Sequence, residues 1–507
     1  MLARFLSDRQ GMVAVVFAVA LIPLVAVTAL AVDVSRAYLV RTRLASAIDA
    51  AGLAMVASNG TSAELKTRLD AFLQANYPDT AIGTRTSVTT MTVGEKTTIT
   101  ATASVDTTFA KIFGMFSPAS VDTIDVSVSN EVVREVTGLE VALVLDNTGS
   151  MKDGTKMADL KSAAKSLVDK LSAAAQRSSK PDAVRLGLVP YTMTVNVGSY
   201  TYENAPSWID KDGNSPINNQ IFTGSTAVKR LKLFPAMSTS WGGCVEARPS
   251  PYDVTESPPT TATPATLYVP YFAPDEPDTD DAGYVNHYLN DESNSSDWKV
   301  RQGNPNKYDN RPRSGTTSLG YKYGPNSGCE IKPLTRLTTN FTTFKTAIDA
   351  MVAGGDTNIS AGLMWGWHVL SPNAPYADGK PYTDKKYTKI VILMTDGQNH
   401  NVVLNNKNAS AYSGIGYIWQ GRIGITSGTL SKRIQTLDDK LELACNNAKA
   451  AGVVIYTVVL KDAAVDQTTV KNCASSPDKM FDVTDSAQFQ RVFDTIAGAI
   501  QNLRLSK

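Results

Sequence analysis

The chain has 507 residues, of which 43% are hydrophobic and 19% are charged. It is too long for one average domain, and a chain of this length typically forms about three structural units. The apolar content is sufficient for buried cores. The formal net charge of +1 leaves no basic excess to neutralise phosphates, which argues against a nucleic-acid partner.

Residues 11–32 form an uncharged, apolar run near the N-terminus. About 20 helical residues at ~1.5 Å each cover the ~30 Å hydrocarbon core of a bilayer, so this run predicts a transmembrane helix. A cleavable signal peptide is the alternative, but its apolar region would be only about 7 to 15 residues long. The Ala-rich stretch at 34–57 keeps helical spacing. We therefore assign residues 1–58 to an anchor and extended helix.

Residues from about 86 to 135 are rich in Thr and Val and alternate in the manner of strands. Gly94 is placed for a turn between the first two. We expect a small, pilin-like α+β region at 59–136. Its Thr-rich face could bind a partner, although a solvated sheet face is the commoner explanation.

Residues 137–505 alternate apolar strands with amphipathic helices, which predicts an α/β domain with a mostly parallel sheet. The expected strands lie at 139–145, 184–190, 390–394 and 453–460. The expected helices lie at 157–175, 344–351, 360–370, 430–451 and 487–503.

Residues from about 197 to 333 interrupt this alternation with many Pro, Asn, Asp, Tyr and Gly residues. A structureless loop of that length is unusual in a compact domain, so we expect an insertion with its own organisation. Its acidic run, starting at Asp275 and Glu276, lacks the spacing and Gly of an EF-hand, and we expect a solvated loop there. Several aromatic residues favour a small core over a binding surface: Trp208, Trp241, Tyr271, Tyr284 and Trp298.

The four cysteines are far apart, which excludes CxxC metal or redox motifs. Their even number fits two disulfides in an oxidising compartment, and the alternative is four buried thiols in a reducing cytosol. Of the three possible pairings we favour Cys244 with Cys329 and Cys445 with Cys473. This interpretation places most of the chain outside the inner membrane, whereas the arginines on either side of the apolar run do not decide its orientation.

Three separated segments supply oxygen-bearing side chains at the ends of predicted strands. Asp146, Thr148 and Ser150 follow one strand at alternate positions, and Asp396 follows another. Thr357 lies in the loop before a predicted helix. Because open parallel sheets bind ligands at the carboxyl ends of their strands, we expect these side chains to converge. Carboxylates and hydroxyls suit Mg²⁺, which takes oxygen ligands and usually keeps several waters.

This set resembles the metal-ion-dependent adhesion site of the von Willebrand factor A domain, which combines Asp-x-Ser-x-Ser with a distant Thr and a distant Asp. Here Thr148 replaces the first serine and keeps the hydroxyl. The resemblance implies a Rossmann-like fold, with Thr148, Ser150 and Thr357 as hydroxyl ligands of Mg²⁺ or another divalent cation. Asp146 and Asp396 would lie close by and act through water, with one coordination position open to a partner's carboxylate.

The N-terminus resembles the TadE/TadG-like family of Flp pilus-assembly proteins. The matching parts are a short leader that ends at Gly11, the apolar span, the Asp33-Val34-Ser35-Arg36 stretch and an Ala-rich helix at 46–54. Relatives that are cut by prepilin peptidase carry Glu five residues after the Gly, where this chain has Val16. That departure favours the TadG-like branch, which keeps its anchor and carries a von Willebrand factor A domain behind it.

Together these features predict a pilus-assembly or adhesion protein of a tight-adherence system. It would cross the inner membrane once, with a cytoplasmic N-terminus and a periplasmic bulk, or would reach the cell-envelope surface. The expected partners are pilus components or other envelope proteins that offer a carboxylate, with homo-oligomers possible. An enzyme is not expected, since His287, His368 and His400 lie in unrelated contexts. The alternatives are an envelope scaffold with a vestigial metal site and, less favoured, a metal-dependent hydrolase.

Overall fold

The computed structural model describes residues 9–56, 62–78, 83–93, 96–114, 122–133, 137–176, 178, 180, 182–224, 226–278, 283–291, 295–461 and 466–503. The chain divides into two compact units, Met1–Val136 and Thr137–Lys507. Each unit has hydrophobic clusters of its own and is considered by itself.

The first unit is built on one long helix, α2 (Arg9–Val56). Within the described residues, it is the one helix long and apolar enough to span a membrane. Its early side chains are exposed, whereas Val40, Leu44 and Ile48 further along are completely buried. They pack against Ile99 and Ala101 of a small sheet. The extended helix and the sheet therefore share one core.

That sheet is antiparallel, with the strand order β1-β2-β3. Its elements and the two accompanying helices are α3 (Ser62–Asn76), β1 (Thr84–Val93), β2 (Lys96–Asp106), α4 (Phe109–Gly114) and β3 (Thr123–Val133). The predicted turn at Gly94 lies outside the described residues. Asp33 of α2 is buried, and its carboxylate accepts hydrogen bonds from the backbone N–H groups of Thr108, Phe109 and Ala110 at the start of α4. This acidic residue thus joins the long helix to α4.

The second unit is a mixed α/β structure around a six-stranded sheet with the order β11-β10-β9-β4-β5-β8. The strands are β4 (Gly138–Asp146), β5 (Val184–Tyr191), β8 (Thr335–Thr338), β9 (Tyr387–Thr395), β10 (Val454–Leu460) and β11 (Met480–Val483). Only β8 is antiparallel to its neighbour. The chain builds outward from β4 to β8 and then returns to β9 on the other side of β4. This reversal of direction places a crevice outside the carboxyl ends of β4 and β9.

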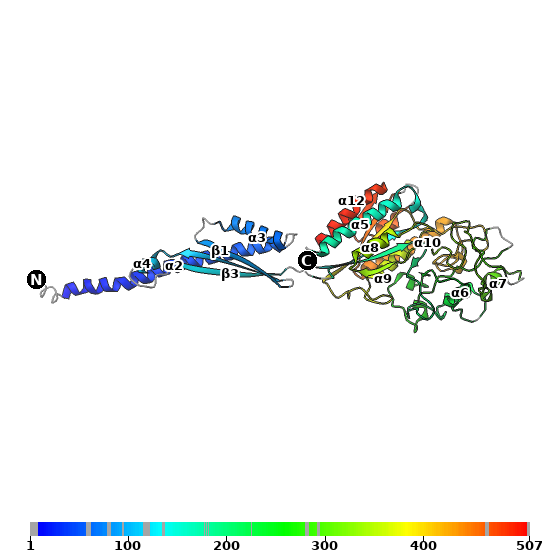
Figure 1. The fold of residues 1–507 in the computed structure, drawn as a ribbon, viewed down its shortest axis with the longest axis horizontal. Helices are drawn as coiled ribbons and strands as arrows, with labels where there is room; N and C mark the ends of the chain where they lie inside the picture. The colour runs from blue at the N-terminus through cyan, green and yellow to red at the C-terminus, as the bar shows by residue number, and fades with distance from the viewer. Residues whose placement is uncertain are drawn as a thin grey trace. The chain divides into compact units, whose positions relative to one another are not determined.

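Helices cover both faces of this sheet (Figure 1). One face carries α5 (Lys156–Gln176), α8 (Phe341–Asp349) and α12 (Phe489–Leu503), which share a core with alternate residues of β4. The other face carries α9 (Ile359–Leu370), α10 (Leu430–Ala450) and the short α11 (Thr468–Asn472). Because both faces are covered, the described residues of β4 are all buried, as expected for a central parallel strand.

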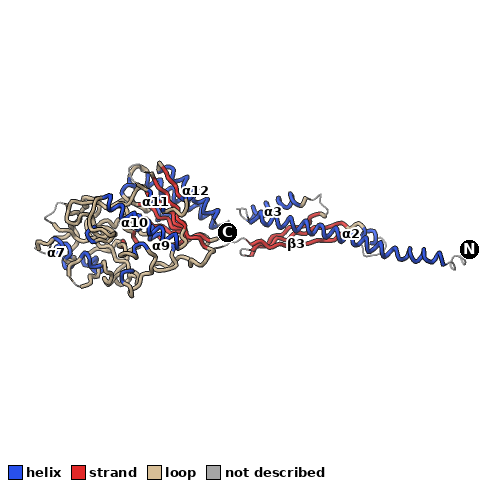
Figure 2. The backbone as a smooth tube through the Cα atoms, turned by 180° about the vertical axis from the view of Figure 1, so that it is seen from behind, coloured by secondary structure: helices blue, strands red, loops and turns tan. Residues whose placement is uncertain are grey.

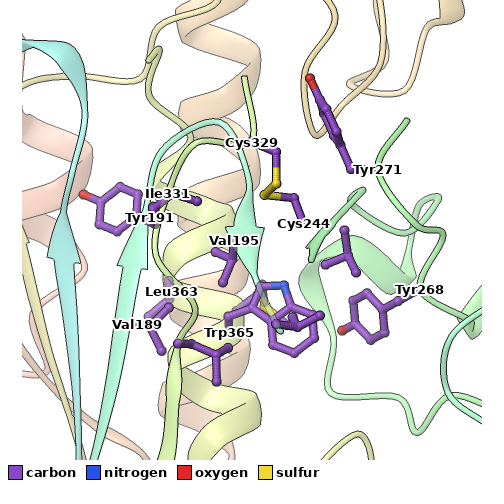
Figure 3. Packing of buried hydrophobic residues seen from close by; sticks show 14 of the residues in the cluster. Val189, Tyr191, Val195, Cys244, Tyr268, Tyr271, Cys329, Ile331, Leu363 and Trp365 are labelled. Carbon is purple, nitrogen blue, oxygen red and sulfur yellow. A yellow bond between two sulfur atoms is a disulfide. The ribbon is translucent and has the colours of Figure 1, made fainter. Parts of the chain in front are cut away.

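The long insertion is folded, although most of it is loop (Figure 2). Its regular elements are β6 (Val195–Asn196), α6 (Arg230–Ala236), β7 (Cys244–Val245) and α7 (Trp298–Gly303). The Cys244–Cys329 disulfide closes it beside Val195 and Ile331 (Figure 3), and a second disulfide joins Cys445 to Cys473. These are the two pairings that the sequence favours.

The aromatic residues of the insertion form a core that continues into the domain. Trp208, Trp241, Tyr271 and Tyr284 are buried, whereas Trp298 is half-buried. The ring centroids of Trp208 and Trp365, a residue of α9, lie 6.1 Å apart. The insertion therefore packs directly on the helix that covers one face of the sheet.

The expectation of a solvated acidic loop is wrong for its first two residues, because Asp275 and Glu276 are fully buried. The Lys307 ammonium lies 2.8 Å from the Asp275 carboxylate. Glu276 accepts hydrogen bonds from the backbone N–H of Asn286 and from the Tyr417 hydroxyl. A buried charge needs such partners, and here they tie separate loops of the insertion together.

Candidate metal centre

Asp146 ends β4, and its side chain organises the turn that follows. The backbone N–H and the hydroxyl of Thr148 donate hydrogen bonds to one of its oxygens, at 2.8 and 2.6 Å. The Thr395 hydroxyl donates to the other oxygen at 2.7 Å. Asp146 and Thr148 are both buried. Asp146 is thus held by neutral donors from the turn itself and from the neighbouring strand β9.

Asp396 approaches the same turn from the end of β9. The Ser150 hydroxyl donates a hydrogen bond to Asp396 Oδ1 at 2.6 Å, and Ser150 Oγ lies 3.2 Å from Thr148 Oγ1. Four side chains therefore form a continuous row of oxygens from one carboxylate to the other. When both hydroxyl protons point to the carboxylates, the two hydroxyl oxygens face each other with lone pairs, an arrangement that attracts a cation.

The loop that carries Thr357 is joined to this turn through backbone hydrogen bonds. Gly149 N–H donates to Gly355 O at 2.8 Å, and Gly354 N–H donates to Asn147 O at 2.7 Å. Gly355 has a φ of 91°, a conformation that favours glycine, which lets the loop turn sharply there. Within the described chain, the Thr357 hydroxyl makes no hydrogen bond, so none joins it to the other four predicted residues.

The electrostatic environment of Asp146 is unfavourable for an isolated carboxylate. Burial raises its pKa to about 6, and the nearby Asp396 charge adds to this increase. Among the described residues, no Lys, Arg or His forms an ion pair with Asp146. The same burial, together with the charge of Asp146, raises the pKa of the neighbouring Tyr191 well above its usual value. A cation at this position would relieve the repulsion between the two carboxylates.

Lys156, the first residue of α5, is a member of the site that the sequence analysis missed. Its ammonium lies 2.8 Å from Asp396 Oδ2 and also donates to Ser150 O at 3.2 Å. The Asp396 side chain is completely shielded from solvent, so this ion pair is largely desolvated. Its position only six residues after Ser150 is the one available sequence signal.

The donor set fits a hard divalent cation, because it consists of two carboxylates and hydroxyls. It does not fit zinc or a thiolate-bound metal. Across the described residues there is no group of three or more His, Cys, Asp or Glu side chains that could hold a metal, and this centre has only two such residues. Hydroxyl ligands and water would therefore have to complete the coordination.

The histidines do not join this set as ligands. His368 is buried in α9 and shares a short hydrogen bond with Tyr268. His400 pairs through its backbone with Thr357, while its Nδ1 lies 3.1 Å from an Asp356 oxygen. The hydrogen bond with Asp356 raises the pKa of His400. His287 is placed in the insertion, with its ring 5.5 Å from that of Tyr323.

The anchor segment matches a known family. Residues 11–58 match the family model described as putative Flp pilus-assembly TadE/G-like. The match covers the apolar span, the Asp33 stretch and the Ala-rich helix. A comparison with curated proteins gave no match.

Three similar solved structures illustrate the comparison with known folds. Proximal thread matrix protein 1 from the mussel byssus is 12% identical, with 72% of this chain and 47% of that chain covered and a TM-score of 0.29. The pilus adhesin SpaC from Lactobacillus rhamnosus GG is 11% identical, with 84% of this chain and 36% of that chain covered and a TM-score of 0.34. The vWF domain of the type V pili tip protein Mfa5 from Porphyromonas gingivalis is 12% identical, with 73% of this chain and 97% of that chain covered and a TM-score of 0.34. This chain spans less than half of the first two proteins.

Proposed function

We propose that the chain is a membrane-anchored component of a tight-adherence (Flp/Tad) pilus system, with most of its length in the periplasm. Its second unit would act as a von Willebrand factor A domain that binds a carboxylate of a pilus or envelope protein through Mg²⁺. The observation that carries this proposal is the unbroken row of oxygens from Asp146 to Asp396 at the carboxyl edge of β4 and β9.

Each of the five residues would have a distinct role in binding the metal. Thr148 and Ser150 offer hydroxyl oxygens to the metal, and Thr357 offers a third hydroxyl that no other described residue uses. Asp146 and Asp396 supply negative charge and hold the hydroxyls in place. When bound, the metal would supply an open coordination position for the partner's carboxylate. The TadE/G-like match of the anchor supports the assignment to pilus assembly. Binding, rather than turnover, is the proposed activity.

The test is capture of purified pili by the full-length protein in detergent, with Mg²⁺ or with a chelator. We expect Mg²⁺-dependent capture that Asp146→Ala abolishes. Asp349→Ala is the matched control, because Asp349 is an exposed carboxylate in α8 that pairs with Lys165 instead of the site residues. Equal capture with chelator, or undiminished capture by Asp146→Ala, would contradict the metal-bridged function.

A second candidate is an envelope scaffold whose metal site is vestigial, and the position of Lys156 favours it. The Lys156 ammonium already neutralises Asp396, as a structural ion pair would. Thermal melting of the full-length protein separates the two candidates, because a metal that binds the folded state must raise its apparent stability. The scaffold hypothesis predicts that the protein melts at the same temperature with an excess of Mg²⁺ and with chelator.

A further inference from the structure

A cavity of about 540 Å³ lies in the insertion between the segment at 199–203, helix α6 and the segment at 239–241. This volume is within the ~300–1,000 Å³ typical of small-molecule sites. The proposed metal centre uses none of its lining residues. Four aromatic residues contribute to its wall: Tyr200, Tyr202, Phe234 and Trp241.

The aromatic part of the wall is held rigidly. The Trp241 indole N–H donates to Cys244 O at 3.0 Å, and Cys244 is fixed by its disulfide to Cys329. The Ser199 hydroxyl donates to Trp241 O from the adjoining strand end. The ring centroids of Tyr200 and Trp241 lie 6.2 Å apart with a tilt of 33°. The half-buried Tyr200 ring, which packs against the buried Trp241, is thus ordered before any ligand arrives, which lowers the entropy cost of binding.

Tyr202 lies on the side of the cavity that carries the charged residues Glu203 and Lys232. Its hydroxyl donates to Asp212 at 2.6 Å and accepts from Lys229 at 3.0 Å, so its ring is fixed as well. The Lys232 ammonium lies 4.4 Å from the centre of this ring. Lys232 forms no ion pair and Glu203 makes no side-chain hydrogen bond with any described residue, and both line the cavity. The Lys232 ammonium over the Tyr202 ring and the unbonded Glu203 carboxylate therefore accompany the aromatic residues of the wall.

We propose that this cavity binds one ring of a neutral glycan. A sugar ring has an apolar C–H face, which packs on the electron-rich face of an aromatic ring, and hydroxyls that both donate and accept hydrogen bonds. Glu203 accepts from such hydroxyls, and Lys232 donates to them. An anionic ligand would meet the Glu203 carboxylate, so the balance of charge favours a neutral sugar.

Saturation-transfer NMR on the full-length protein in a sugar-free detergent tests this site. The probes are neutral hexasaccharides of glucose, galactose, mannose and N-acetylglucosamine, with a galacturonate hexamer as the acidic comparison. We expect at least one neutral probe to bind, also with chelator present, because the metal centre is not involved. Tyr202→Ala should weaken its binding about twofold to tenfold, since an aromatic packing contact is worth ~0.5–1.5 kcal/mol.

Lys232→Gln and Glu203→Gln should each weaken binding as well, by about threefold to tenfold for an exposed hydrogen bond. The matched control is Lys299→Gln, because Lys299 of the insertion is also exposed and lies over an aromatic ring, 4.9 Å from the centre of Trp419. Melting temperatures confirm that each variant is folded. Failure of all neutral probes, stronger binding of the acidic probe, or unchanged binding by folded Tyr202→Ala would each overturn the proposal.

Discussion

Strand β4 carries two buried acids that the structure treats in opposite ways. Glu140, near its start, contacts Arg185 and Lys389, with the Lys389 ammonium 2.5 Å from Glu140 Oε2. Asp146, at its end, receives hydrogen bonds from hydroxyl and amide groups and has no cationic partner among the described residues. Both side chains are fully buried. The charge at one end of the strand is neutralised by the fold, whereas no cationic side chain among the described residues neutralises the charge at the other end.

The largest expected effect comes from removing the buried ion pairs of Glu140 at the start of β4. Glu140→Ala leaves Arg185 and Lys389 without their carboxylate, and removing one partner of a buried ion pair costs about 3–5 kcal/mol. We expect a clear fall in the melting temperature, equal with and without Mg²⁺. A change of less than 1 °C on calorimetry, about the effect of an exposed substitution, would show that Glu140 is not needed for stability.

Asp146→Asn tests the acid at the end of β4, and it should raise the stability of the metal-free protein instead of lowering it. The variant removes an uncompensated buried charge while keeping a side chain of similar shape, so the metal-free protein should gain about 1–3 kcal/mol in stability. It should also lose any stabilisation by Mg²⁺. Differential scanning calorimetry with Mg²⁺ and with chelator measures both effects. If Asp146→Asn melted lower than the original protein in chelator, the two ends of β4 would not differ as described.

Lys156→Met tests how strongly the Lys156 ammonium already neutralises Asp396 at the end of β9. Removing the ammonium leaves Asp396 with only the Ser150 hydroxyl, so Mg²⁺ should bind about tenfold more tightly, or by about 1.4 kcal/mol. Isothermal titration calorimetry gives the affinity. Lys161→Met is the control, because Lys161 also lies on α5 but donates to Asp349 O. Equal affinities of the two variants for Mg²⁺ would show that Lys156 does not influence metal binding.

The smallest effect is expected at a third acid, the half-buried Asp438 of α10, whose carboxylate accepts a hydrogen bond from the neutral Asn399 amide at 2.7 Å. Burial raises its pKa from 3.8 to about 6. A raised carboxyl pKa means that the folded state binds the proton more tightly, so stability from this group is lost as pH rises from about 4 to 6. Asp438→Asn should therefore gain in melting temperature relative to the original protein at pH 7 and not at pH 4. The same difference at both values would exclude titration of Asp438.

The parts of the fold that depend on local pattern could be predicted from sequence. Long apolar runs gave β4 and β9, and helical spacing gave α5, α9 and α10, within a few residues of their observed ends. The four-residue strands β8 and β11 were not anticipated, since such short segments carry too little periodicity and are defined by their partners.

The candidate site shows the same limit. Asp146, Thr148 and Ser150 lie in one turn, so their convergence follows from spacing alone. The contact between Lys156 and Asp396 joins residues 240 positions apart and depends on where α5 starts relative to β9. Asp275 and Glu276 were misjudged for a related reason: an acidic run looks solvated until the distant Lys307 and Tyr417 are placed beside it.

The antiparallel strand β8 has a consequence for how such a protein can diversify. Leu188, near the end of β5, pairs with Thr335 at the beginning of β8, so the chain leaves and re-enters the sheet at the same end. The long insertion is in effect an oversized hairpin loop, grafted next to the turn that holds Asp146. Its sequence can therefore change without altering the order of the strands, provided that an aromatic contact with Trp365 is retained.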